Sequence, residues 1–273
     1  MSMQDIAQRG LYLLGCGKMG LAMLSGWLEG GLPATAVWVT DPHPSPWLDS
    51  LVKQGLHLND RIPPSPAVAL LAVKPQMMDE ALPGLASLGG GDTLMLSVAA
   101  GTPLARFELG LGAGTPIVRA MPNTPAAIGK GITAIIGNGA AGEHHLALAQ
   151  SLLSAIGEVI RLEAEEQMDA VTALSGSGPA YVFHMVEAMA AAGEAQGLSS
   201  ALAMQLARAT VSGAGALLEH SEETASQLRI NVTSPKGTTE AGLKVLMDGA
   251  TGLPPLVRAT VAAAAQRSRE LGR

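Results

Sequence analysis

The stretch LYLLGCGKMG, residues 11–20, decides the fold that we expect for this chain. Its first four residues are apolar and typical of a buried strand, and a helical pattern follows the last glycine. Gly-x-Gly-x-x-Gly between a strand and a helix is the fingerprint of dinucleotide binding. Gly15 allows the tight turn, Gly17 lets a pyrophosphate approach the backbone, and Gly20 lets the helix pack closely on the strand. The start of the chain is therefore predicted to form a nucleotide-binding domain.

A second predicted strand, residues 36–40, ends at an acidic residue, Asp41. An acidic residue roughly 20 positions after the fingerprint binds the hydroxyls of the adenine ribose in this class of domain. A carboxylate repels a 2'-phosphate, and no arginine follows, so the local chemistry favours NADH over NADPH. The alternative is that Asp41 only initiates an Asx turn before Pro42.

Further short apolar runs alternate with helical segments up to about residue 160. This alternation predicts an α/β fold with a Rossmann-type, doubly wound and mainly parallel sheet. Ligands bind such sheets at the carboxyl ends of the strands, so the loops that begin at Lys74, Ala99 and Asn123 are expected to lie beneath a nicotinamide. Each of these loops could equally be an ordinary turn after a strand. The remaining predicted strands are residues 68–73, 93–98, 117–121 and 132–136.

After residue 160 only helical patterns remain, which divides the chain into residues 1–160 and residues 161–273. Alanine and glycine dominate several helix faces in the second part, and small side chains bury little apolar area each. We therefore expect a second copy of the chain to complete the core of this helical domain as a homodimer. A glycine-rich break at residues 175–179 is expected to start a helix, with Ser177 as its cap and Pro179 at its first position. A plain turn between helices is the alternative there.

A second loop of interest lies in NVTSPKGTTEAGLKVLM, residues 231–247. Gly237 provides backbone freedom just before a helix, and Thr238 is an acceptable N-cap. Such a loop directs free N–H groups, the positive end of the helix dipole and nearby hydroxyls toward one point, where a small carboxylate can bind. An ordinary capped helix start that binds nothing is the alternative on these local features.

Composition limits the function classes. The net charge of -6 argues against a nucleic-acid partner, because phosphate binding needs a basic surface. The single Cys16 excludes an intrachain disulfide and fits a reducing compartment. The first residues lack the pattern of a signal peptide, and the apolar tracts are interrupted before they reach the length of a membrane span. We expect a cytoplasmic protein with no membrane partner, and no set of residues indicates a metal site.

Six motifs in one order make the chain resemble pyrroline-5-carboxylate reductases along essentially its whole length. They are GCGKMG at 15–20, LAVKPQ at 71–76, SVAAG at 97–101, RAMPNTP at 119–125, LSGSGPAY at 174–181 and VTSPKGTTEAGL at 232–243. The resemblance implies a Rossmann domain followed by a helical dimerisation domain, with dimers often assembled into a decamer. It also implies reduction of 1-pyrroline-5-carboxylate to L-proline, the last step of proline biosynthesis, with NADPH or NADH.

The resemblance also assigns residues to roles. Ser234 and Thr239 would be catalytic, with the Thr239 hydroxyl meeting the ring nitrogen of the substrate. The substrate carboxylate would be held by the Ser234 side chain and by N–H groups at 237–239, and the glycine-rich segment would form a wall of the pocket. The expected substrate-binding residues are Ser234, Gly237, Thr238, Thr239, Ser175, Gly176, Ser177, Gly178 and Pro179. The expected cofactor-binding residues are Gly15, Cys16, Gly17, Lys18, Met19, Gly20, Asp41, Val73, Lys74, Pro75, Ala99, Ala100, Met121, Pro122 and Asn123.

Two residues depart from the family pattern. Lys236 stands where glycine is common, which reduces the freedom of the loop and adds a charge that either attracts the carboxylate or points into water. Asp41 replaces the small or hydroxyl residue of NADP-preferring members. Two alternative functions fit the sequence less well. A 3-hydroxyacid dehydrogenase-like enzyme would need a lysine or histidine on the first long helix, where this chain has Gln167, Asp169 and Thr172. A non-catalytic nucleotide sensor would have no reason to keep both the 175–179 and 234–239 segments.

Overall fold

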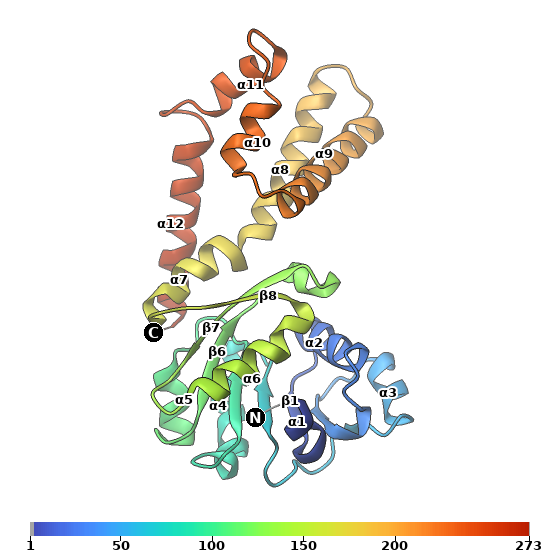
Figure 1. Cartoon of the computed structure of the whole chain (residues 1–273), viewed down its shortest axis with the longest axis vertical. Helices are drawn as coiled ribbons and strands as arrows, with labels where there is room; N and C mark the ends of the chain where they lie inside the picture. Colours follow the sequence, from blue (N-terminus) through green and yellow to red (C-terminus); the bar gives the residue numbers. More distant parts are fainter. Residues whose placement is uncertain (1–2, 273) are drawn as a thin grey trace. The chain divides into compact units, whose positions relative to one another are not determined.

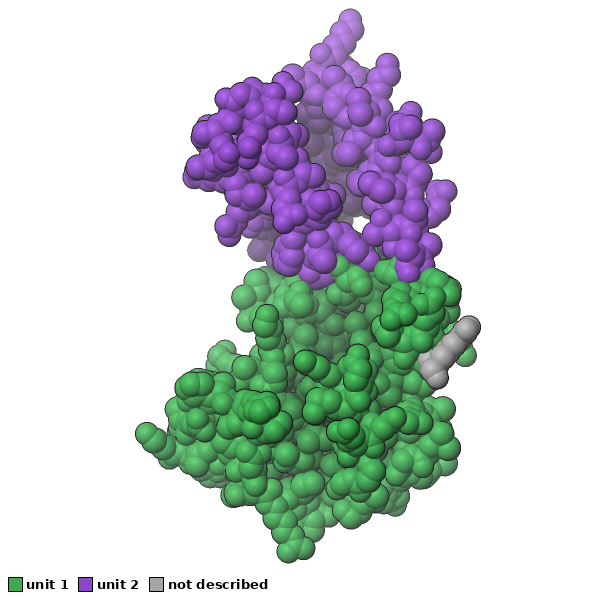
Figure 2. Space-filling view, turned by 180° about the vertical axis from the view of Figure 1, so that it is seen from behind, with its two compact units in different colours: residues 1–177, 264–273 green, residues 178–263 purple. Residues whose placement is uncertain are grey.

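The computed structural model describes residues 3–272, which form two compact units (Figures 1 and 2). Unit 1 extends to Ser177 and resumes at Ala264, and unit 2 is Gly178–Ala263. The compact units therefore do not divide at residue 160. The segment after the sheet stays with unit 1 because it packs there together with the end of the last helix. One contact of this packing is a hydrogen bond of 2.6 Å from the Ser268 hydroxyl to Asp169.

Unit 1 is built on an eight-stranded sheet in the order β3-β2-β1-β4-β5-β6-β7-β8. Neighbouring strands are parallel except for β6 and β7, which are antiparallel, so the mainly parallel Rossmann-type fold is confirmed. The sequence missed β3 and β8, which are short or largely polar. The strands are β1 (Leu11–Leu14), β2 (Val37–Thr40), β3 (His57–Leu58), β4 (Val68–Leu71), β5 (Leu94–Ser97), β6 (Ile117–Met121), β7 (Gly131–Gly137) and β8 (Gly157–Arg161).

Helices cover both faces of this sheet (Figure 1). The α-helices of unit 1 are α1 (Met3–Arg9), α2 (Lys18–Glu29), α3 (Pro46–Val52), α4 (Met78–Ala81), α5 (Leu104–Leu111), α6 (Glu143–Leu153) and α7 (Met168–Val171). Short 3-10 turns join them at η1 (Ala34–Ala36), η2 (Pro75–Met77), η3 (Leu82–Leu88), η4 (Thr124–Ile128), η5 (Ser154–Ile156) and η6 (Glu165–Gln167).

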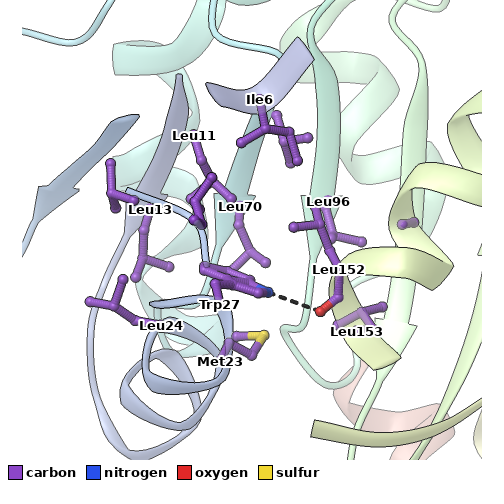
Figure 3. Close-up of a cluster of buried hydrophobic side chains, with 14 of the residues drawn as sticks. Ile6, Leu11, Leu13, Met23, Leu24, Trp27, Leu70, Leu96, Leu152 and Leu153 are labelled. Carbon is purple, nitrogen blue, oxygen red and sulfur yellow. Dashed lines mark hydrogen bonds between the residues drawn. The ribbon is translucent and has the colours of Figure 1, made fainter. Parts of the chain in front are cut away.

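The alternation of side chains along the strands produces two separate hydrophobic cores. Leu11 and Leu13 of β1 pack on one face with α2, α3 and α6, whereas Tyr12 between them packs on the other face with η3 and α5. In the first core the fully buried Trp27 of α2 donates its indole N–H to the carbonyl of Leu152, at 2.9 Å (Figure 3). The buried indole is thus both packed and hydrogen-bonded, which fixes α2 and the fingerprint loop against the sheet.

Unit 2 contains α8 (Gly178–Ala195), α9 (Ser200–His220), α10 (Ala225–Asn231) and α11 (Thr238–Leu246), and most of α12 (Leu253–Leu271). Its only cluster of buried hydrophobic side chains within the described residues is Ala190, Ala203 and Ala207. Large apolar side chains such as Phe183, Leu217 and Leu256 are more than half exposed. In its length and composition, α9 could also cross a membrane, although only 11% of that apolar window is buried. Unit 2 by itself therefore buries little apolar side-chain area.

The segment 175–179 agrees with the prediction only in part. Its first two residues end a π-helical turn, η7 (Thr172–Gly176), that follows α7, and α8 then begins at Gly178, so Pro179 is the second helical residue and not the first. Ser177 has helical backbone angles and donates its N–H to the carbonyl of Thr172 at 2.8 Å, so it does not cap α8. The local pattern could not indicate the π-turn, because glycine and serine are typical of loops.

Candidate functional site

The fingerprint loop has the conformation that its glycines predict. Gly15 has a φ of +84°, and Gly20 lies so close to the carbonyl of Gly15 that an added Cβ would come within 2.7 Å of that oxygen. An added Cβ at Gly17 would meet no atom within 4 Å. No side chain caps α2, whose N-cap is Gly17. The loop therefore offers an open backbone at a helix N-terminus, which suits a pyrophosphate.

Asp41 lies directly against this loop. Its Oδ2 accepts the Cys16 N–H at 2.7 Å, and its Oδ1 accepts the His43 N–H at 2.8 Å. The second bond is the Asx turn, so that interpretation of Asp41 is confirmed, whereas the ribose interpretation stays a prediction. Burial, followed by the nearby Asp41 charge, raises the pKa of the Cys16 thiol to about 12. Cys16 is therefore a neutral, buried side chain, and its backbone N–H is already bonded to Asp41.

One residue that the sequence missed also holds Asp41. The Asn59 side chain accepts the Asp41 N–H at 2.9 Å and donates to the Asp41 carbonyl at 3.0 Å. Asn59 has a φ of +55°, which is uncommon for any residue except glycine but tolerated by asparagine. That tolerance is the only signal in the sequence that could have indicated this residue.

The other predicted cofactor residues follow the ends of adjacent strands. Val73, Lys74 and Pro75 follow β4, Ala99 and Ala100 follow β5, and Met121 ends β6 before Pro122 and Asn123. Pro75 and Ala100 line a cavity of about 390 Å³ in unit 1. Ala99, Pro122 and Asn123 are buried, whereas Lys74 and Pro75 are exposed. The sheet thus brings these predicted residues to the carboxyl ends of neighbouring strands, as expected.

Two predicted groups that are far apart in the sequence meet in unit 1. The Asn123 amide donates to the Ser175 hydroxyl at 3.4 Å, and an added Cβ at Gly176 would lie 2.5 Å from the methyl of Met121. Asn123 is itself fixed, because its side-chain oxygen accepts the Ile132 N–H at 3.0 Å. The expected nicotinamide floor and the first part of the expected substrate wall are therefore continuous. Gly178 and Pro179 begin α8 in unit 2.

The loop at residues 234–239 belongs to unit 2. Gly237 is the N-cap of α11, and Thr238 is its first helical residue, so the prediction of Thr238 as the cap is wrong by one position. The Gly237 N–H donates to the carbonyl of Ser234 at 3.0 Å, which closes a turn and removes one of the three N–H groups expected to bind a carboxylate. Ser234, Thr238 and Thr239 are exposed, and no side chain caps α11.

Lys236 is the second non-glycine residue with a positive φ, at +58°, within the described residues. Its position in the turn is the one at which a type II turn requires a positive φ, after a proline. The N–H of Lys236 donates to Glu240 at 2.5 Å. Throughout the described residues, no cluster of three or more histidine, cysteine or acidic side chains could hold a metal ion.

Comparison with known proteins identifies the family. The family described as pyrroline-5-carboxylate reductase dimerisation matches residues 165–271. A pyrroline-5-carboxylate reductase of Pseudomonas aeruginosa is 38% identical over 261 residues, which cover 94% of this chain and 95% of that protein. The chain belongs to the pyrroline-5-carboxylate reductase family.

Other members support this assignment. A pyrroline-5-carboxylate reductase of Synechocystis is 46% identical over 206 residues, covering 76% of this chain and 75% of that protein. The structure of a pyrroline-5-carboxylate reductase from Coxiella burnetii has a TM-score of 0.90 at 34% identity and covers 97% of this chain and 99% of its own. A pyrroline carboxylate reductase from Plasmodium falciparum, solved with NADP bound, has a TM-score of 0.81 at 25% identity, with coverage of 98% and 99%.

Proposed function

We propose that this chain reduces 1-pyrroline-5-carboxylate to L-proline with a reduced nicotinamide cofactor. The observation that carries the proposal is the relationship along almost the full length of the reductase from Pseudomonas aeruginosa, which spans the nucleotide fingerprint and the 234–239 loop. The reduced nicotinamide supplies the hydride for the imine carbon. The residues of the chain contribute to catalysis by binding and orienting the two reactants.

We assign cofactor binding to residues 1–160. The fit of a dinucleotide is supported by the open space above Gly17 and by the uncapped start of α2. The carboxylate of Asp41, held on the Cys16 N–H, supports a preference for NADH, because it would accept ribose hydroxyls and repel a 2'-phosphate. The residues proposed to hold the cofactor are 15–20, Asp41, 73–75, Ala99, Ala100 and 121–123.

We assign substrate binding to residues 161–273. The exposed N–H groups at the start of α11 and the Ser234 hydroxyl would bind the substrate carboxylate, with the helix dipole adding a favourable charge. The Thr239 hydroxyl would lie at the ring nitrogen and donate to its lone pair as that lone pair develops during hydride transfer, which stabilises the forming amine. The 175–179 segment would form a wall of the pocket. No dedicated acid is needed if the imine binds in its protonated form.

We further infer that the chain works as a homodimer through its helical unit, and that dimers assemble into a decamer. The exposed apolar side chains of unit 2 support a partner on that unit, since they would otherwise remain in water. Sedimentation velocity over a range of concentrations tests this assembly, and a stable monomer would refute it. We also propose that the protein is located in the cytoplasm.

The reaction is tested by initial rates of NADH and NADPH oxidation with 1-pyrroline-5-carboxylate. Thr239→Val should lower kcat by about tenfold to a hundredfold, the size of one or two lost hydrogen bonds in a transition state, and Thr238→Val is the matched control. Cofactor binding without turnover would refute the reductase proposal. Full turnover by Thr239→Val would refute only the role of that hydroxyl.

A further inference from the structure

The side chain of Asn59 pairs with the backbone of Asp41 in two directions. Its Oδ1 accepts the Asp41 N–H at 2.9 Å, and its Nδ2 donates to the Asp41 carbonyl at 3.0 Å. The Asn59 N–H is itself bound to the carbonyl of Val39 at 2.8 Å. Asn59 thereby continues the β2–β3 pairing beyond the two residues of β3 and fixes the peptide groups on both sides of Asp41.

The strand that precedes Asn59, β3, is anchored independently of any ligand. The imidazole of His57 in β3 stacks on Trp38 of β2, with ring centroids 4.2 Å apart and planes within 5° of parallel. The same imidazole lies 3.3 Å from the carboxylate of Asp60. Asp60 thus contacts His57, whereas Asn59 contacts Asp41, although both residues are neighbours and both are exposed.

The carboxylate of Asp41 is fixed as firmly as its backbone. Each of its oxygens accepts one peptide N–H, from Cys16 and from His43. A carboxylate has about four acceptor positions, so two remain available to a ligand after these bonds. A carboxylate fixed in this way loses little conformational freedom when it accepts two hydroxyls, and it cannot turn away from an approaching phosphate.

We propose that Asn59 is a positioning residue that sets the choice between the two cofactors by immobilising Asp41. The inference rests on the proposed NADH preference and deepens it. When the carboxamide is lost, the backbone of Asp41 loses two hydrogen bonds, and only the Cys16 and His43 N–H groups still hold its carboxylate. Asp41 then moves more freely, so binding a ribose with free hydroxyls costs additional ordering. The same mobility lets the carboxylate move away from a 2'-phosphate, which relieves the repulsion. NADH binding should weaken and NADPH binding should improve.

Asn59→Gly tests this, because glycine adopts a positive φ without strain and lacks the carboxamide. Dissociation constants of NADH and NADPH are measured by fluorescence titration without imine, alongside the melting temperature. We expect the ratio of the NADPH to the NADH dissociation constant to fall about tenfold, the size of one net hydrogen bond. The matched control Asp60→Ala removes the contact to His57 and should leave the ratio unchanged.

A double-mutant cycle separates positioning from direct contact with the cofactor. If Asn59 acts through Asp41, Asn59→Gly should not alter the ratio in an Asp41→Ser background. A change of the same size in both backgrounds would overturn the proposal, and so would an equal loss of affinity for both cofactors. A wild-type protein that prefers NADPH would refute the cofactor preference itself. An unchanged ratio in Asn59→Gly, with NADH preferred by the wild type, would refute only the role of Asn59.

Discussion

Gly17 and Gly20 should have different roles when each is replaced by alanine. We expect Gly17→Ala to weaken cofactor binding and Gly20→Ala to destabilise the fold. Both lie in one loop and both gain a single methyl group. The surroundings differ, because an added Cβ meets nothing within 4 Å at Gly17 but would lie 2.7 Å from a backbone oxygen at Gly20. Gly17 has a φ of -69°, which alanine adopts freely.

The magnitudes follow from these surroundings. At Gly20 the crowding partner is main chain and cannot rotate away, so Gly20→Ala should cost about 1–3 kcal/mol of stability as overpacking. At Gly17 the only folding cost is a poorer N-cap for α2, about 0.5–1 kcal/mol. In the complex, however, the new methyl would stand where the pyrophosphate reaches the backbone. Losing one or two charge-assisted hydrogen bonds should then raise the dissociation constant of NADH about tenfold to a thousandfold.

Two measurements on each variant give the result. The melting temperature should fall by about 2–4 °C per kcal/mol for a chain of this size, so Gly20→Ala should melt clearly below Gly17→Ala. Fluorescence titration should show that Gly17→Ala loses more affinity for NADH, relative to the stability that it loses, than Gly20→Ala does. Wild-type affinity in Gly17→Ala would refute the placement of the pyrophosphate. An unchanged melting temperature in Gly20→Ala would refute the close approach of α2 to β1.

Three further predictions concern stability. Arg119→Ala should cost about 2–4 kcal/mol in urea denaturation, because it leaves the Glu165 carboxylate without its buried partner at 2.7 Å. Arg106→Ala breaks only an exposed ion pair with Asp79 and should cost much less stability, so equal losses in the two variants would contradict the argument. Lys236→Gly should raise stability by about 0.5–1 kcal/mol, since relief of the left-handed strain exceeds the entropy that glycine adds to the unfolded chain, and a lower melting temperature would contradict it. The native Cys16 thiol keeps its proton up to a pKa of about 12, whereas the unfolded chain loses it near 9.0, so stability should decline between these pH values by up to about 1.4 kcal/mol per pH unit. Cys16→Ala should flatten that slope above pH 9, and an unaltered slope would show that other groups cause the decline.

Much of the sheet could be predicted because its strands have strong local patterns, whereas the roles of the residues that follow these strands stay predictions. The ends of β1, β4, β5 and β6 fall within about two residues of the predicted ends, which is the usual uncertainty for element boundaries. Besides the missed strands β3 and β8, errors occur at helix ends near glycine. Gly237 takes the cap position expected for Thr238, and its N–H donates to the carbonyl of Ser234. The sequence could not indicate this hydrogen bond, because it forms only when the backbone folds into the turn. Whether the other expected contacts of this loop form is left to the assays above.

The sequence by itself determined the tight turn at Gly15 and the buried strands, because backbone preferences and apolar periodicity act over a few neighbouring residues. It also determined the family, because the motifs follow one another in the family's order. Only the tertiary structure decided that β7 runs antiparallel to β6, that residues 172–176 form a π-turn, and that Asn59 holds Asp41. These features depend on which segments become neighbours after the sheet has assembled. The contact of Asp41 with Cys16 joins residues 25 positions apart, and it exists because β1 and β2 are adjacent and end at the same edge. A hydrogen bond across that edge leaves no periodic trace in the sequence, so it becomes visible only in the folded chain.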